Sequence, residues 1–116
     1  MPLDPTYTIT VNTQAHTLTL YKDGKAFRTY PVAVGKPTTP TPKGSFHIVN
    51  KAVNPGGPFG VRWMGISAPG GGYGIHGTNN PGSIGKSISH GCVRMFNQDV
   101  TELYNLVPVG TAVNII

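Results

Sequence analysis

The sequence predicts one mostly β domain built from short strands and a single helix. Glycine and proline are frequent, with 16 and 11 of 116 residues. Because they follow no collagen-like period, they indicate many turns between short strands. Several segments alternate apolar and polar residues, which is typical of strands with one buried face. A chain of this length suits one modest core, so we expect residues 1–116 to form a single domain.

The first third of the chain is predicted to be a β-meander. Asp23-Gly24 is the dipeptide favoured in two-residue hairpin turns, because both positions of the turn need positive φ. The stretch 35–44 is rich in proline, which blocks helix and ladder pairing, and is expected to be a loop. The expected strands are 6–12, 16–21, 26–35, 45–50, 61–67, 73–78 and 111–116.

The one helix is predicted near residues 98–107. Asn97 or Asp99 is expected to cap its start, with Glu102 completing a capping box. A proline and a glycine directly after it end the helix. Its apolar residues recur with helical spacing and form one stripe, consisting of Val100, Leu103, Tyr104 and Val107.

The charge balance is basic, with a net charge of +5. Such an excess favours anionic partners such as nucleic acid, anionic lipid or a polyanionic cell wall. The lysines are scattered and no RNA-binding aromatic signature occurs, so we expect no nucleic-acid partner. No stretch approaches the ~20 apolar residues of a membrane span. The start lacks the pattern of a secretory signal, so we expect a cytosolic chain or a mature or excised domain.

The only cysteine, Cys92, lies in the segment SISHGCVRM, with His90 before it and Arg94 after it. His76 also sits beside a glycine where a strand meets a loop, and a glycine-rich loop between them lets thiol and imidazole meet. An imidazole can take the proton of a thiol, and the thiolate attacks carbonyl carbon. A backbone carbonyl can fix the imidazole tautomer, since no carboxylate is near His76 in sequence. Backbone N–H groups around His-Gly-Cys are the expected oxyanion donors.

Two other interpretations of Cys92 stay open at this point. A free cysteine is often an inert, buried core residue. A zinc-dependent hydrolase would use His76, His90 and Cys92, although zinc sites usually need more ligands than one cysteine and its neighbours supply. We expect no metal and no cofactor. His16 and His47 fall within strand patterns and are expected to be structural or surface residues.

The segment IHGT, followed after a glycine-rich loop by SHGCVRM and then Asn97, resembles the signature of the L,D-transpeptidase (YkuD-type) catalytic domain. That signature has His-Gly or His-Ser, a spacer, then Ser/Thr-His-Gly-Cys, a hydrophobic residue and an arginine. The resemblance covers about residues 7–115. It implies a β-sandwich of short strands with one short helix, and a cysteine enzyme acting on peptidoglycan stem peptides in the cell envelope. We expect it to be a monomer.

Carried over by position, the resemblance implies a role for each residue of the motif. Cys92 is the nucleophile and His76 its general base. The Gly77 carbonyl orients the imidazole, and the N–H groups of Gly91 and Cys92 form the oxyanion hole.

The resemblance also implies a set of substrate-binding residues. Ser89, His90 and Arg94 match motif positions that shape the site, and Arg94 would hold a stem-peptide carboxylate or brace the loop. The region 54–72 is expected to cover the site, with Trp63 in contact with the substrate.

The implied reaction passes through a thioester on Cys92. The thiolate attacks the carbonyl after the third, L-configured centre of a tetrapeptide stem, and D-alanine leaves. An amine of another stem then gives a 3→3 cross-link, whereas water gives L,D-carboxypeptidase activity. A non-catalytic cell-wall-binding module with the same fold is the remaining alternative.

Overall fold

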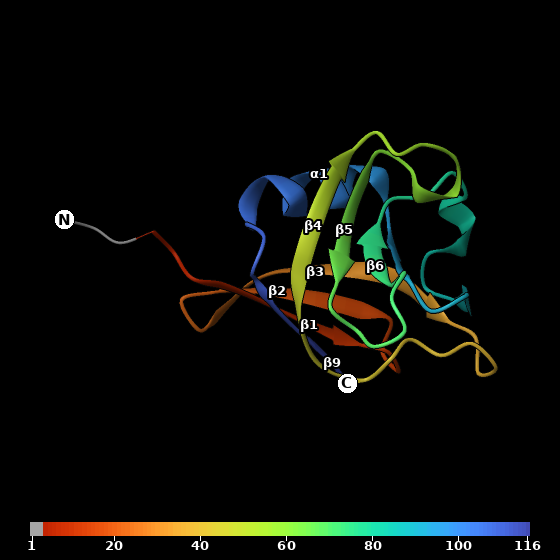
Figure 1. Ribbon diagram of the computed structural model, residues 1–116, viewed down its shortest axis with the longest axis horizontal. Coiled ribbons are helices and arrows are strands. Elements are labelled where there is room, and N and C mark those ends of the chain that lie inside the picture. The colour runs from red at the N-terminus through yellow and green to blue at the C-terminus, as the bar shows by residue number, and fades with distance from the viewer. Residues whose placement is uncertain (1–3) are drawn as a thin grey trace.

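The strands of the computed structural model, which describes residues 4–116, form one sheet that closes on itself (Figure 1). Neighbouring strands run in the order β2-β1-β9-β4-β5-β6-β8-β3-β7, and a further pairing of β2 with β3 closes the ring. The mostly β prediction is confirmed. The strands are β1 (Tyr7–Asn12), β2 (Thr17–Lys22), β3 (Lys25–Gly35), β4 (Gly44–Val53), β5 (Arg62–Ile66), β6 (Gly74–His76), β7 (Ser87–Ser89), β8 (Val93–Met95) and β9 (Ala112–Ile115).

Two long strands give the barrel its sandwich-like form. The first part of β3 pairs with β2, and its second part pairs with β8 through Val32 and Ala33. The first part of β4 pairs with β9, and its second part pairs with β5. Figure 1 shows β4, β5 and β6 running across the direction of β1, β2 and β3. The sheet therefore folds into two layers that share strands, which fits the predicted β-sandwich.

The predicted β2–β3 hairpin is present, with the expected backbone at its turn. Asp23 has φ of 51° and Gly24 has φ of 80°, as a type I′ turn requires. Burial alternates along β1 and β2, as predicted, and the inward residues form one wall of the core. Fully buried members of the core include Ile9, Val11, Leu18, Leu20, Val32, Ile48, Met64, Ile75, Val93, Met95, Leu103 and Ile115. Burying a side chain of this size stabilises the fold by about 1.5–3 kcal/mol.

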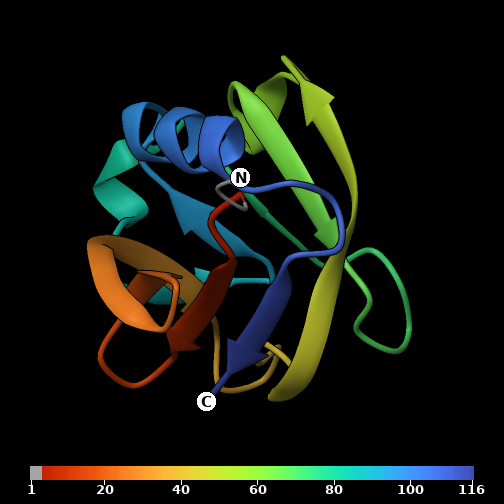
Figure 2. The same ribbon diagram turned by 90° about the vertical axis from the view of Figure 1, so that its left-hand side faces the viewer.

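Helix α1 (Asn97–Leu106) packs against β5 and β6 and buries Val100 and Leu103. Figure 2 shows it lying across one end of the sheet layers. The predicted cap is wrong. Phe96 occupies the N-cap position without a side-chain hydrogen bond, and Asn97 is the first helical residue. The side chain of Asn97 instead binds backbone groups of Val61 and Thr78.

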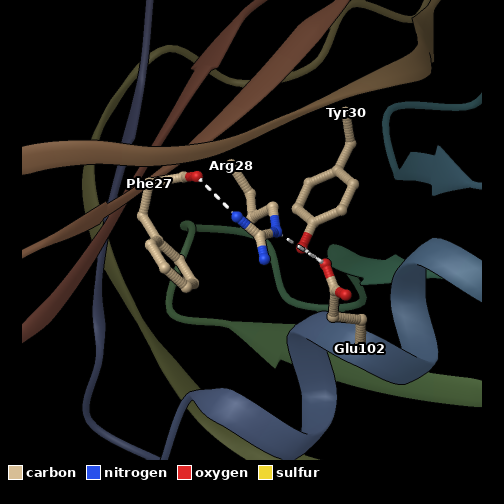
Figure 3. A network of polar contacts seen from close by, with 4 residues as sticks. All are labelled: Phe27, Arg28, Tyr30 and Glu102. Carbon is tan, nitrogen blue, oxygen red and sulfur yellow. Dashed lines mark hydrogen bonds and ion pairs between the residues drawn. The ribbon is translucent and has the colours of Figure 1, made fainter.

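Glu102, the other half of the expected capping box, ties α1 to β3 (Figure 3). Its Oε1 accepts a 2.5 Å hydrogen bond from the Tyr30 hydroxyl and lies 3.6 Å from Nε of Arg28. Burial and this acceptor both raise the pKa of Tyr30 above its ordinary value. The carboxylate therefore serves a tertiary contact between helix and barrel, which leaves it unable to reach the helix start.

The other end of α1 is held by Lys51 of β4. Its Nζ donates to the carbonyls of Tyr104 and Val107 at 2.7 and 2.8 Å, and it lies 3.9 Å from the centre of the Tyr104 ring. No basic residue lies in the last turn of the helix itself. Lys51 thus satisfies carbonyls that the helix leaves unpaired. Within residues 4–116, no helix has the length and apolar character needed to cross a bilayer.

Candidate active site

Parallel pairing of β6 with β8 brings the two predicted chemical groups to one end of the sheet. Ile75 pairs with Val93 and His76 with Arg94. Cys92 directly precedes β8, so its side chain and the imidazole of His76 reach the same pocket of about 290 Å³. The pocket is lined by Pro58, Phe59, Gly72, His76, Ser89, His90, Cys92 and Arg94.

The imidazole of His76 is held in one tautomer by the backbone. Only 3% of His76 is exposed, and its Nδ1 forms a 2.5 Å hydrogen bond with the Gly77 carbonyl. A carbonyl can only accept, so Nδ1 carries the proton and Nε2 of the neutral ring is free to accept one. Burial lowers the pKa of His76, and the positive charge of Arg94 lowers it further. The hydrogen bond to the Gly77 carbonyl raises the same pKa and partly offsets these two effects.

The thiol of Cys92 is half-buried and lies beside the glycine-rich segment that precedes β6. Its Sγ donates to the Gly72 carbonyl at 3.5 Å. Burial raises the pKa of this thiol, while a hydrogen bond from the Gly74 backbone and the charge of Arg94 act in the opposite direction. Both pKa shifts favour the uncharged forms of the thiol and the imidazole.

Ser89 braces the turn that presents Cys92. Its buried hydroxyl accepts a hydrogen bond from the Gly91 N–H at 3.1 Å and donates to the Cys92 carbonyl at 2.6 Å. Gly91 has φ of 120°, and a Cβ there would lie 2.5 Å from Cε1 of Tyr73. The turn therefore needs glycine at this position. The hydroxyl of Ser89 therefore binds the backbone of the motif. The sequence predicted a contact between Ser89 and the substrate, and did not predict this structural role.

The remaining predicted residues take two different positions. His90 and Arg94 line the pocket, the first exposed and the second half-buried. Trp63 is the cross-strand partner of His76 and stacks on its ring, with centroids 5.6 Å apart and planes at 14°. It is not among the residues that line the pocket, so its contact with substrate stays a prediction. Phe59 of the 3-10 turn η1 (Gly57–Phe59) does line it, as expected of the region 54–72.

Two residues support the site in ways that the sequence did not indicate. Thr39 donates its hydroxyl to the Ser89 carbonyl at 2.8 Å, so the proline-rich loop supports the cysteine motif. Asn97 binds the loop that follows His76. A threonine in a proline-rich loop carries no signal of such a role. Asn97 was noted within the family signature and as a possible helix cap, but neither pattern indicates that its amide binds the loop after His76.

Two larger pockets lie elsewhere on the described part of the chain. They measure about 500 and 520 Å³ and flank the segment that precedes β1. Neither is lined by a histidine or by the cysteine. Size alone therefore does not mark the candidate site, whereas the presence of a thiol and an imidazole in one pocket does.

Comparisons with known proteins give a consistent result. A family model described as the L,D-transpeptidase catalytic domain matches residues 6–115. The chain is 55% identical over 109 residues to YkuD of Bacillus licheniformis, and the alignment covers 94% of this chain. It is 43% identical over 128 residues to YqjB of Bacillus subtilis, and that alignment covers 97% of this chain and 72% of YqjB. It spans 65% of the length of YkuD from either Bacillus licheniformis or Bacillus subtilis.

Solved structures agree with the sequence comparison. The catalytic domain of the Enterococcus faecium L,D-transpeptidase has a TM-score of 0.80 at 30% identity, covering 95% of this chain and 96% of that domain. An L,D-transpeptidase from Mycobacterium smegmatis has a TM-score of 0.81 at 26% identity, covering 97% of this chain and 59% of that one.

Proposed function

Because this chain belongs to the YkuD family of L,D-transpeptidase catalytic domains, we propose that it is a cysteine acyltransferase acting on peptidoglycan stem peptides. One observation supports the mechanism above all others. His76 donates Nδ1–H to the Gly77 carbonyl, which leaves Nε2 free in the same pocket as the Cys92 thiol. A base with a fixed tautomer beside a nucleophile is the arrangement that acyl transfer requires. Since peptidoglycan lies outside the cell membrane, the proposed place of action is the cell envelope.

Acylation begins from a neutral pair. Nε2 of His76 takes the Cys92 proton as Sγ attacks a carbonyl carbon of the tetrapeptide stem. This carbonyl belongs to the L-configured centre of the third residue and is joined to the terminal D-alanine. The tetrahedral intermediate then collapses, the C–N bond to D-alanine breaks, and the imidazolium returns its proton to the leaving amine. The product is a thioester on Cys92. His76 therefore acts as the general base in this step.

Deacylation reverses the roles of the same groups. A side-chain amine from a second stem attacks the thioester carbonyl while Nε2 of His76 accepts its proton. The C–S bond breaks, Cys92 is regenerated, and the new amide is a 3→3 cross-link. Water in place of the amine would give a tripeptide and L,D-carboxypeptidase activity.

Backbone donors at the motif would stabilise the oxyanion of both intermediates. The Gly91 N–H already donates to Ser89, so its use as an oxyanion donor requires that bond to give way. The Cys92 N–H is therefore our proposed principal donor, placed by the Ser89-braced turn. Arg94 adds positive charge to the pocket wall, which favours a stem-peptide carboxylate. Removing one such donor typically lowers kcat by about 10²–10³-fold.

The direct test is incubation with a disaccharide-tetrapeptide, with muropeptides and intact protein followed by mass spectrometry. We expect loss of D-alanine, a Cys92-linked acyl-enzyme and cross-linked dimer. Cys92→Ala and His76→Ala should abolish these products, whereas His47→Ala, which alters a histidine on the exposed part of β4, should retain them. Tripeptide alone would identify a carboxypeptidase. Binding to peptidoglycan with no turnover in the unaltered protein would contradict the proposed function.

A further inference from the structure

We propose that Asn97 is the positioning residue that aims the Gly77 carbonyl at His76 and so fixes the tautomer of the general base. The inference rests on the proposed function and assigns part of its catalytic geometry to the first residue of α1. Asn97 does not face the thiol. It acts on the far side of the peptide unit that His76 contacts.

The side-chain amide of Asn97 binds two separate backbone segments. Its Oδ1 accepts the N–H of Thr78 at 3.1 Å and the N–H of Val61 at 3.3 Å. Its Nδ2 donates to the Thr78 carbonyl at 3.0 Å. Both acceptor positions of the amide oxygen are therefore used, and the side chain is partly buried. An amide with three backbone hydrogen bonds holds a single orientation.

Two glycines leave the space in which this amide lies. A Cβ on Gly77 would lie 2.1 Å from Oδ1 of Asn97, and a Cβ on Gly60 would lie 2.3 Å from the same atom. Gly60 also has φ of 64°, which disfavours other residues. The backbone before Val61 and the backbone after His76 thus meet at one side-chain oxygen, and neither segment tolerates a side chain there.

Planarity of the peptide bond links this contact to the base. The carbonyl of Gly77 and the N–H of Thr78 belong to the same rigid peptide unit and point in opposite directions. Asn97 holds the N–H side of that unit, and the Nδ1–H of His76 binds its carbonyl side. Fixing one side fixes the direction of the other. The carbonyl therefore receives Nδ1–H and keeps the proton off Nε2.

The same oxygen also anchors the aromatic wall of the pocket. Val61 follows the turn that carries Phe59, and the Phe59 ring meets the His76 ring edge-on at 5.2 Å. Asn97 thus supports the orientation of the imidazole through its hydrogen-bonding side and through its contact with Phe59. Helix formation does not explain the residue, because Asn97 makes no cap and asparagine has low helix propensity.

The test compares Asn97→Ala with Asn105→Ala, which removes an exposed asparagine from the same helix. Imidazole proton–nitrogen correlation spectra report which ring nitrogen of His76 is protonated. We expect the unaltered protein and Asn105→Ala to show the Nδ1–H tautomer alone and Asn97→Ala to show a mixture of both. Turnover of the tetrapeptide should fall by about 100-fold in kcat for Asn97→Ala, with KM changed far less, because misplacement of a catalytic group acts on the chemical step.

A second variant keeps the shape of the side chain. Asn97→Asp keeps an oxygen that can accept the N–H groups of Val61 and Thr78. It replaces Nδ2, which donates to the Thr78 carbonyl, with a second oxygen. Repulsion between this oxygen and the Thr78 carbonyl should shift the backbone after His76, so we expect the same spectra to show both tautomers. This variant decides the question if Asn97→Ala does not fold.

A folded Asn97→Ala with the Nδ1–H tautomer alone and kcat within about twofold of the unaltered protein would overturn the inference. So would a folded Asn97→Asp that shows the Nδ1–H tautomer alone. Failure of the proposed function looks different, because the unaltered protein would then leave tetrapeptides intact. The tautomer spectra need no substrate, so they judge the role of Asn97 in either case.

Discussion

The neutral thiol–imidazole pair predicts a steep pH dependence of Cys92 reactivity. Burial raises the pKa of the thiol and lowers that of His76, so we expect the folded protein to hold no thiolate–imidazolium pair at rest. Only the thiolate reacts with iodoacetamide. Raising the pH from 6 to 8 should therefore increase the alkylation rate throughout that range.

The size of the effect follows from the ionised fraction. A thiol with the ordinary pKa of about 8.5 is about 3% thiolate at pH 7, and a raised pKa makes the fraction smaller. Well below its pKa, the thiolate fraction grows tenfold for each pH unit. We therefore expect an increase of about 100-fold in the alkylation rate constant between pH 6 and pH 8. Restricted access of iodoacetamide to the half-buried thiol lowers the alkylation rate constant by the same factor at every pH. The ratio between pH 8 and pH 6 is therefore unchanged.

The assay follows the mass increase of the intact protein at a series of pH values. The same chain unfolded in urea supplies the reference, since its thiol is fully solvated. We expect the folded curve to lie at higher pH than the unfolded one, and His76→Ala to change its shape little. A rate that stays level between pH 5 and pH 7 would refute the reasoning, because it would reveal a preformed ion pair. A folded midpoint below that of the unfolded chain would do the same.

Two further predictions concern stability and the motif turn. Lys51→Met should lower the free energy of unfolding by about 3 kcal/mol, because two hydrogen bonds from a charged donor are lost, each contributing about 1.5 kcal/mol. Urea unfolding measures this loss, and Lys25→Met should change the free energy of unfolding by no more than about 0.5 kcal/mol. Gly91→Ala should abolish turnover, because its Cβ would meet the Tyr73 ring at a positive φ, whereas Gly24→Ala, with open space around it, should cost only about 1 kcal/mol and retain full activity.

Local patterns predicted most of the strands because each pattern has a local cause. Alternation in β1 and β2 places every second side chain in the core, and Asp23-Gly24 supplies the backbone that the hairpin turn needs. The division of β3 and β4 between two layers has no such local cause. It arises from the pairing of segments far apart in the chain, so the closed form of the sheet could not be predicted from any one stretch.

The site shows the same division between local and distant causes. Cys92 and His76 stand out because a reactive motif has a recognisable order of residues. The stacking of Trp63 on His76 depends on the register of β5 against β6, which no motif encodes. Asn97 was predicted as a helix cap because asparagine before an apolar stripe usually is one. Its side-chain amide instead forms a tertiary contact with the backbone of Thr78.

The position of β9 has a consequence for how the protein acquires its activity. This strand lies between β1 and β4, parallel to the first and antiparallel to the second. A growing polypeptide that ends before residue 112 has no strand to place between them. Pairing across almost the full chain is also slow, because distant segments must find each other first. We therefore expect the proposed thiol site to form only after residues 112–115 have been synthesised and have paired with β1 and β4.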